Sequence, residues 1–311
     1  MMIAAYFLRH QIIVIFDKLS EIYDSYQNDD TFHSVVRVNE QSEWLWKMYF
    51  IFVLGGFVVN SLLLVLISIL YCWFVNGYLD VTSFHRTYKT VLPWDQETLM
   101  GFGFATCFDL FGADSYFISN GSLLLLFISM CLHHEAFLKR FQQEMSKFDH
   151  TLENTKHRDI LCKLVRFHII TKEWFLQSAD TYRHFVLVQL ISSVIFLACI
   201  VFQLDLQSKH PSVNLVLMLF GVFVSGTNLF VYCFFGKLAT ESYTKIADCL
   251  YEANWREVSI DLQKYIIVMI QNAQRPLYYH GFGIAVLNLE TFCGLLQKVA
   301  TFYMAFKTFT E

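Results

Sequence analysis

A regular row of small and polar residues near the carboxyl terminus is the part of the sequence best suited to do chemistry. Residues three and four positions apart share one face of a helix. This spacing places six residues on one side of the segment 277–309: Thr291, Gly294, Lys298, Thr301, Ala305 and Thr308. Hydroxyl and ammonium groups on one face can contact water inside a membrane. One hypothesis is therefore that the row lines a pore between copies of this helix.

The same row allows a second interpretation. Small residues also let membrane helices approach closely, so the spacing alone leaves helix packing open. The opposite face of the segment carries apolar residues, namely Phe292, Leu296, Val299, Phe302, Tyr303 and Phe306. Glu290 and Lys298 interrupt the segment, and a charge near the centre of a bilayer costs about 2.5–3.5 kcal/mol on insertion scales. That cost favours a watery or protein-lined face for the row.

Motifs for enzymatic chemistry are not found in the sequence. His133-His134-Glu135 lacks the spacing that places two imidazoles one helical turn apart around zinc, and Gly101-Phe102-Gly103 lacks the third glycine of a phosphate-binding loop. We therefore expect no enzyme, no metal site and no cofactor. The remaining histidines, at positions 10, 33, 85, 150, 157, 168, 184, 210 and 280, are interpreted as solvated or interfacial side chains. A net charge of −4 indicates no nucleic-acid partner.

The composition of the chain indicates that the row lies in a helical membrane protein. The chain of 311 residues is 55% hydrophobic and only 16% charged, which is more apolar than is usual for a soluble domain. Helices of about 20 apolar residues can cross a bilayer, and suitable stretches cover 48–75, 115–132, 185–204, 211–236 and 277–309. We predict an all-α polytopic membrane protein with these five spans in a single membrane domain.

Basic residues set the predicted orientation. Most of the 23 lysines and arginines lie in the segments 1–47, 133–184 and 237–276, and the positive-inside rule places such segments in the cytoplasm. Residues 76–114 then form an extracellular loop, and the carboxyl terminus lies outside the cell. A G-protein-coupled receptor has the opposite arrangement.

The two later cytoplasmic segments carry apolar residues at helical spacing among charges. In 135–183 this pattern predicts a long pair of helices, and in 241–274 it predicts further helices with Ser259 as a candidate N-cap. Apolar helix faces outside the bilayer must pack somewhere. We therefore predict a cytoplasmic helical platform, shared within or between subunits, rather than solvated linkers.

A set of motifs runs through the chain in a fixed order: Leu92-Pro93-Trp94-Asp95, Phe167 to Phe185, Tyr232-Cys233-Phe234-Phe235-Gly236, Trp255, Gln274-Arg275-Pro276, Leu287 to Phe292, and Thr301-Phe302-Tyr303-Met304. In this order and spacing the motifs resemble those of the insect odorant receptors. Each motif alone is weak, but the combination is highly specific and extends over nearly the whole chain.

The resemblance implies an inverted seven-helix subunit with a cytoplasmic amino terminus. Members of that family assemble as tetramers with a shared odorant co-receptor into an odorant-gated, poorly selective cation channel in the plasma membrane of olfactory sensory neurons. The last helix lines the pore, and the cytoplasmic helices form an anchor between subunits. The resemblance also implies that the first helix and most of the second are absent, so we expect 1–47 to hold a remnant of the second helix and a cytoplasmic loop. The expected partners are the co-receptor, a small volatile ligand and the lipid bilayer.

For the odorant pocket we predict the outward ends of the first three full spans, with the residues Ser68, Tyr71, Tyr116, Asn120 and Phe196. Aromatic side chains enclose an apolar ligand, and a few hydroxyl or amide groups orient it. Ordinary helix packing is the alternative for each residue. Within the resemblance, Ala305 aligns with a hydrophobic constriction of the co-receptor and Thr308 lies one turn further out. Constrictions of this type close by dewetting.

Other functions stay open at this point. A gustatory-type receptor, a self-assembling chemoreceptor channel and a truncated receptor without function are the alternatives, although Gln274-Arg275-Pro276 and 288–292 favour the odorant branch. A transporter would be expected to show an internal repeat, and none is found in the sequence.

Overall fold

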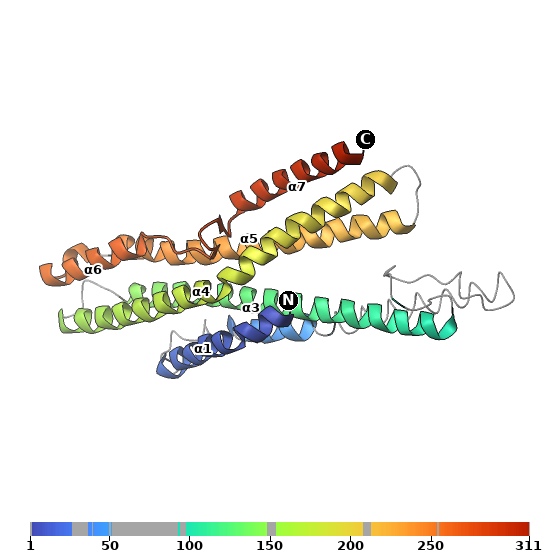
Figure 1. Ribbon diagram of the computed structural model, residues 1–311. Coiled ribbons are helices and arrows are strands. Elements are labelled where there is room, and N and C mark those ends of the chain that lie inside the picture. The colour runs from blue at the N-terminus through green and yellow to red at the C-terminus, as the bar shows by residue number, and fades with distance from the viewer. Residues whose placement is uncertain are drawn as a thin grey trace. The chain divides into compact units, whose positions relative to one another are not determined.

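The protein was analysed as a computed structural model that describes residues 2–26, 37–38, 40–49, 51, 93, 98–147, 154–207, 213–253 and 255–310. Helices predominate in this part of the chain, as predicted for an all-α protein (Figure 1). They are α1 (Met2–Tyr26), α3 (Leu99–Ser146), α4 (Asn154–Gln207), α5 (Val213–Glu252), the short 3-10 helix η3 (Trp255–Glu257), α6 (Ile260–Ala273) and α7 (Leu289–Thr310).

The chain divides into two compact units. Residues 1–7 and 40–126 form the first unit, and residues 8–39 and 127–311 form the second. In the first unit, a Cβ atom at Gly121 of α3 would overlap the phenol ring of Tyr49. The missing side chain at Gly121 therefore allows α3 to lie directly against the helical residues 40–49.

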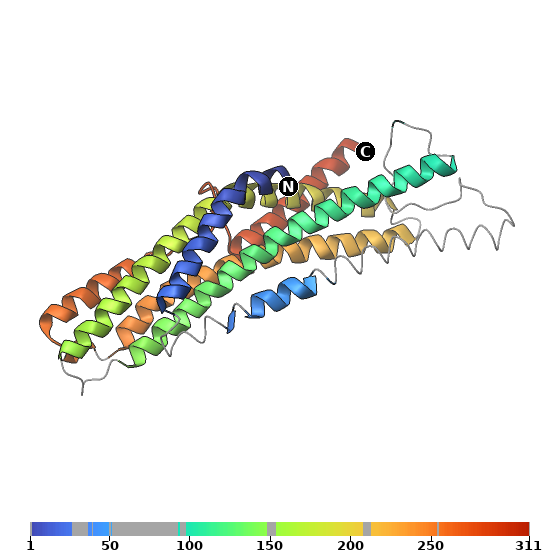
Figure 2. The same ribbon diagram turned by 90° about the horizontal axis from the view of Figure 1, so that it is seen from below.

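In the second unit, α4 packs against both α5 and α7, and α5 packs against α6 and α7. Figures 1 and 2 show α6 and α7 beside opposite halves of α5, with the link between them at the middle. Large side chains that are less than 2% exposed fill the interior: Ile15, Phe127, Phe141, Leu164, Trp174, Phe175, Leu229, Tyr232, Leu250 and Tyr279. This interior joins residues from α1, α3, α4, α5 and the segment before α7.

Three of the predicted spans fall within long helices. Residues 115–132 lie in α3, residues 185–204 lie in α4, and nearly all of 211–236 lies in α5, which begins at Val213. Only residues 48, 49 and 51 of the predicted span 48–75 are among those described. Helices α3, α4 and α5 each continue past the predicted span, because the helical spacing of apolar residues runs on without a proline. The predicted cytoplasmic helices are thus extensions of the spans, except for α6, which is a separate helix.

Length and apolar composition single out three helices of the described residues as able to cross a membrane. These are Ile118–Ser146, Lys156–Leu206 and Gly221–Glu252. Helix α7 has 22 residues, but it is not among the three. Glu290 and Lys298 lower its apolar content, which is the interruption already visible in the sequence.

The segment 277–309 is helical only from Leu289 onward. Before that point the chain forms a small antiparallel hairpin of β1 (His280–Gly281) and β2 (Ala285–Val286), in which His280 pairs with Val286. Phe282 and Gly283 have φ angles of 53° and 73°, in the left-handed region that a glycine adopts without strain. This turn, placed just after Pro276, prevents a single helix from running through the whole segment.

Ser259 occupies the position before α6 that the sequence predicts for an N-cap, but its side chain makes no capping hydrogen bond. Its backbone carbonyl accepts a hydrogen bond from the amide of Gln263 at 3.1 Å. The Gln263 side-chain amide in turn donates to the carbonyls of Arg256 and Val258, each at 2.9 Å. Gln263 therefore secures the turn before α6 in place of the Ser259 hydroxyl.

Candidate functional site

Helix α7 has one packed side. Phe292 contacts Phe230 of α5, with ring centroids 5.5 Å apart, and Phe306 contacts Phe202 of α4, with centroids 5.8 Å apart. Val299 lies between these two levels along the helix and is 8% exposed. Contacts at both ends of α7 therefore hold the same side of the helix against α4 and α5.

The six predicted pore residues lie on the open side of α7. Four of them are exposed, namely Lys298, Thr301, Ala305 and Thr308, and Thr291 and Gly294 are partly exposed. The hydroxyl of Thr301 donates to the carbonyl of Gln297 at 3.1 Å, and that of Thr308 donates to the carbonyl of Met304 at 2.9 Å. Each hydroxyl keeps acceptor capacity for water. Within the described part of this chain, the row is not the side of α7 that packs against other helices.

The predicted apolar face of α7 is divided in the structure. Val299 is buried, and Phe292, Tyr303 and Phe306 are partly buried. Leu296 and Phe302 are exposed. Helix α7 therefore offers apolar surface beside the polar row, where a neighbouring helix or lipid can contact it.

Two polar contacts fix the ends of α7. At the start, the Asn288 side-chain oxygen accepts a hydrogen bond from the amide of Thr291 at 2.7 Å, which is an N-cap. At the end, the ammonium group of Lys307 lies 3.7 Å from the Asp205 carboxylate of α4. The cap sets where α7 begins, and the ion pair connects its last turn to α4.

The histidines correct one interpretation of the sequence. His157 and His168, which we expected to be solvated or interfacial, are only 3% and 4% exposed. His133 and His134, for which no such expectation was made, are 2% and 6% exposed. The Nδ1–H of His133 donates to the carbonyl of Ser129 at 2.7 Å, so its Nε2 accepts from the Tyr23 hydroxyl at 3.1 Å. Burial raises the pKa of Tyr23, which keeps this donor protonated. Satisfied hydrogen bonds and aromatic neighbours such as Trp174 allow these imidazoles to be buried.

The predicted odorant-pocket residues are only partly described. Ser68 and Tyr71 lie outside the described residues, and Tyr116 lies in α3 without a described side chain. Asn120 of the first unit is 8% exposed, and its buried Oδ1 atom has no hydrogen-bond partner among the described residues. Phe196 of the second unit is 53% exposed on α4. The grouping of these five residues into one pocket stays a prediction.

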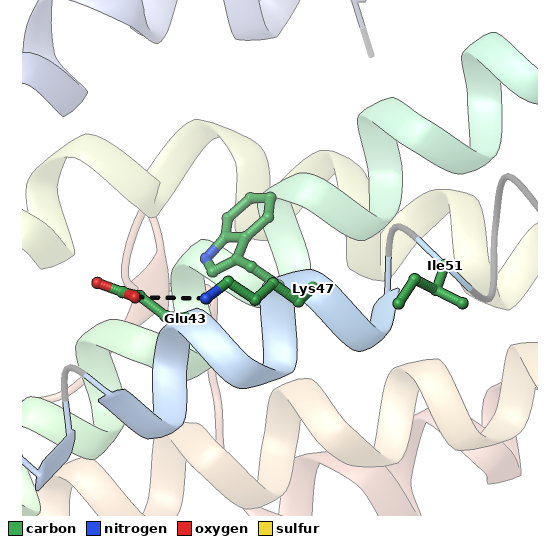
Figure 3. Close-up of a pocket in the computed structure, with 4 residues that line it drawn as sticks. Glu43, Lys47 and Ile51 are labelled. Atoms are coloured by element: carbon green, nitrogen blue, oxygen red, sulfur yellow. Dashed lines mark ion pairs between the residues drawn. The ribbon is translucent and has the colours of Figure 1, made fainter.

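A hollow beside the helical residues 40–49 and residue 51 is lined by Glu43, Trp46, Lys47 and Ile51 (Figure 3). Glu43 and Lys47 form an ion pair of 3.8 Å one helical turn apart, and both side chains are largely exposed. All four residues come from one short stretch of the chain. Among the described residues that line the hollow, none is predicted for the odorant pocket.

Two residues of the α7 surroundings were not singled out from the sequence. Tyr279 is fully buried beside the hairpin, and Asp205 pairs with Lys307. Both depend on contacts between distant parts of the chain, which leave no periodic pattern. Among the described residues, no cluster of His, Cys, Asp or Glu could hold a metal ion.

Comparison with known protein families decides the classification. The family described as "7tm Odorant receptor" matches residues 2–299. The chain belongs to the odorant receptor family. The resemblance seen in the sequence motifs is thereby confirmed.

Individual relatives agree with this assignment. Odorant receptor 49a of Drosophila melanogaster is 22% identical to this chain. The alignment covers 97% of this chain and 76% of odorant receptor 49a. The odorant receptor coreceptor of Anopheles gambiae is 24% identical over 40% of this chain and 26% of the coreceptor.

A solved structure has the same fold. The insect olfactory receptor OR5 from Machilis hrabei matches with a TM-score of 0.69 and 14% identity, covering 98% of this odorant receptor and 78% of that chain. The same receptor in complex with eugenol matches with a TM-score of 0.65 and 15% identity. The helical membrane fold predicted from the sequence is confirmed.

Proposed function

We propose that this odorant receptor is a subunit of a ligand-gated, non-selective cation channel that it forms with the odorant coreceptor. The observation that carries the proposal is the exposed row on α7. Lys298, Thr301, Ala305 and Thr308 stay exposed while the packed side of α7 contacts α4 and α5. A helix that faces only lipid has no use for such residues, whereas copies arranged around water need one polar side each.

The comparisons support the choice of partner and ligand. This chain is similar in sequence to odorant receptor coreceptors of mosquitoes and ants. The similarity supports a common subunit fold, which would allow this chain and a coreceptor to assemble around the same pore. The complex of a structural relative with eugenol supports a small organic ligand. We infer a volatile, apolar odorant for this chain, with four subunits around one pore.

The odorant is proposed to bind among Ser68, Tyr71, Tyr116, Asn120 and Phe196. A ligand favours an open channel only if it binds the open arrangement more tightly than the closed one. The buried Oδ1 of Asn120, which has no hydrogen-bond partner in the described part of the chain, supports a role in which a hydroxyl-bearing ligand or a water molecule donates to it. Replacement of Tyr71 and Tyr116 by alanine should shift the odorant dose–response curve, and an unchanged curve would remove them from the pocket.

The gate is proposed at the outer part of α7, at Ala305 with Thr308 one turn further out. Because alanine is small, this subunit leaves closure to bulkier residues of the coreceptor. The proposed membrane orientation follows from the distribution of basic residues, with 133–184 and 237–276 in the cytoplasm and Glu311 outside. In this arrangement the extensions of α3, α4 and α5 and helix α6 form the cytoplasmic anchor between subunits.

The experiment that tests the function is expression in cells with and without a coreceptor, with recording of odour-evoked current. The proposal expects a cation current only when both chains are present at the surface. A receptor that reaches the surface with its coreceptor and gives no current to a broad odorant panel contradicts the proposal. A current from this chain alone contradicts the hetero-oligomer and favours a self-assembling channel.

Orientation has a separate test. An epitope fused after Glu311 should be labelled on intact cells, because the last helix is proposed to end outside. Labelling only after permeabilisation would overturn the assigned topology and, with it, the position of the gate.

A further inference from the structure

The segment 276–288, which joins α6 to α7, is held against two helices at once. The hydroxyl of Thr240 on α5 donates to the carbonyl of Leu277 at 2.8 Å. A Cβ atom at Gly281 would lie 2.9 Å from the Cβ atom of Leu187 on α4, so only a glycine allows the hairpin to lie this close. The chain leading into α7 is therefore in direct contact with α4 and α5.

Tyr279 inserts from this segment into the interior of the second unit. Its side chain is 0% exposed, and its ring centroid lies 5.0 Å from those of Phe127 on α3 and Phe175 on α4. Its hydroxyl is 2.8 Å from Oγ of Ser178 and 3.1 Å from Nε2 of His134. One side chain thus connects the segment before α7 with both α3 and α4.

The direction of these hydrogen bonds follows from counting protons. The single hydroxyl proton of Ser178 is donated to the carbonyl of Phe175 at 2.8 Å, so Ser178 accepts from Tyr279. The Tyr279 hydroxyl then has no proton left for His134 and accepts from the Nε2–H group of the imidazole. The result is one continuous chain from His134 through Tyr279 and Ser178 to the backbone of α4.

The hydroxyl group is not needed to fill space, because a phenylalanine would place the same ring among the same neighbours. Its function is to set where the ring lies, since two buried polar partners are satisfied at only one position of the oxygen atom. The neighbouring Tyr278 is 41% exposed and provides a natural comparison. The same residue type therefore occurs twice in succession, once inside the network and once outside it.

We propose that Tyr279 is the positioning residue that couples α3 and α4 to the pore helix α7. A movement of α3 relative to α4 displaces the oxygen atoms and nitrogen atoms that hold the Tyr279 hydroxyl, and the hairpin carries this displacement into the first turn of α7. The inference rests on the proposed channel function, because it assigns a role in opening rather than in folding.

The experiment compares Tyr279→Phe with Tyr278→Phe in the full receptor expressed with its coreceptor. Tyr279→Phe should change the half-maximal odorant concentration or the unliganded current by about fivefold or more, a typical coupling between two sites, at an unchanged amount of surface receptor. Tyr278→Phe should change neither quantity. Equal responses of the two variants, or a loss of current explained by lost surface receptor alone, would overturn the proposal.

A double-mutant cycle tests the shared hydrogen bond. Because Tyr279 and Ser178 act through one contact, Tyr279→Phe combined with Ser178→Ala should shift the response little more than the larger single substitution. Fully additive shifts would contradict a common network.

Hydrogen exchange separates this inference from the proposed function. In purified receptor, Tyr279→Phe should speed amide exchange in 284–292 relative to Tyr278→Phe, whether or not the channel conducts. If the wild-type receptor passes no current, the channel proposal fails, and the exchange rates alone decide whether Tyr279 positions the start of α7. Unchanged exchange in that case overturns the inference.

Discussion

The carboxylate of Asp205 lies 3.7 Å from the ammonium group of Lys307, and this ion pair joins the last turns of α4 and α7. Directly beside it, the rings of Phe202 and Phe306 are in contact, with centroids 5.8 Å apart. Both charged side chains are about two-fifths exposed. The pair therefore lies at the surface of the second unit, where it limits how the end of α7 moves relative to α4.

Reversal of both charges should preserve this connection. Asp205→Lys or Lys307→Asp alone places like charges together and should lower receptor stability by up to about 1 kcal/mol, the range of exposed pairs. The double variant should recover most of that loss. Thermal unfolding of the purified receptor measures the cycle. The pair Asp261–Lys264, which lies within α6, serves as a control. If the Asp205→Lys/Lys307→Asp double variant is no more stable than the less stable single variant, the two residues do not form a direct pair.

The charge of Lys298 should influence the ions that pass along α7. If the row lines the pore, Lys298→Glu replaces a cation that repels permeant cations by an anion that attracts them. Cation conductance should rise, and the reversal potential in asymmetric salt should shift toward that of a more cation-selective channel.

Lys163→Glu is the matched control, because Lys163 is exposed near the start of α4 and lies outside the row. It should leave the conductance and the reversal potential unchanged. Equal behaviour of the two variants would remove Lys298 from the pore.

Much of the helical architecture could be predicted from the sequence because it depends on local patterns. The periodic apolar residues of α4 and α5 indicate helices, and the six-residue row on α7 indicates an open side, since each pattern is complete within one segment. The residue at which α7 begins was harder to predict from the sequence. Residues 277–288 are as apolar as the helix that follows, and only Pro276, Gly281 and Gly283 signal the turn.

The buried contacts could not be predicted in the same way. Tyr278 and Tyr279 are adjacent and chemically identical, and no property of the local sequence tells which one is buried. The difference arises because His134 and Ser178, far away in the chain, supply the two partners of the Tyr279 hydroxyl. The burial of His168 was not predicted for the same reason, because it depends on contact with Tyr243, which is distant in the chain.

Close packing at Gly236 makes a prediction about stability. A Cβ atom there would overlap the Leu287 side chain and lie 2.8 Å from the Leu287 carbonyl oxygen. Gly236→Ala should therefore destabilise the receptor by about 1–3 kcal/mol through overpacking. At Gly226 of the same helix, no heavy atom of the described residues lies within 4 Å of such a Cβ, so Gly226→Ala should stabilise the helix by about 0.5–1 kcal/mol. Melting temperatures of the two purified variants that move in the same direction would contradict this packing.

The N-cap of α7 gives a test of what sets the start of this helix. The Asn288 side chain accepts the amide proton of Thr291 at 2.7 Å, and its carbonyl accepts the amide of Phe292 at 3.1 Å. Asn288→Ala removes only the side-chain acceptor and should cost about 0.5–2 kcal/mol. Asn288→Asp keeps an acceptor and places a negative charge at the helix start, so it should retain the stability of the wild type. Thermal unfolding together with amide exchange in 289–292 measures both effects. If alanine and aspartate at this position give the same melting temperature and the same exchange, then the start of α7 is set by the hairpin packing rather than by its cap.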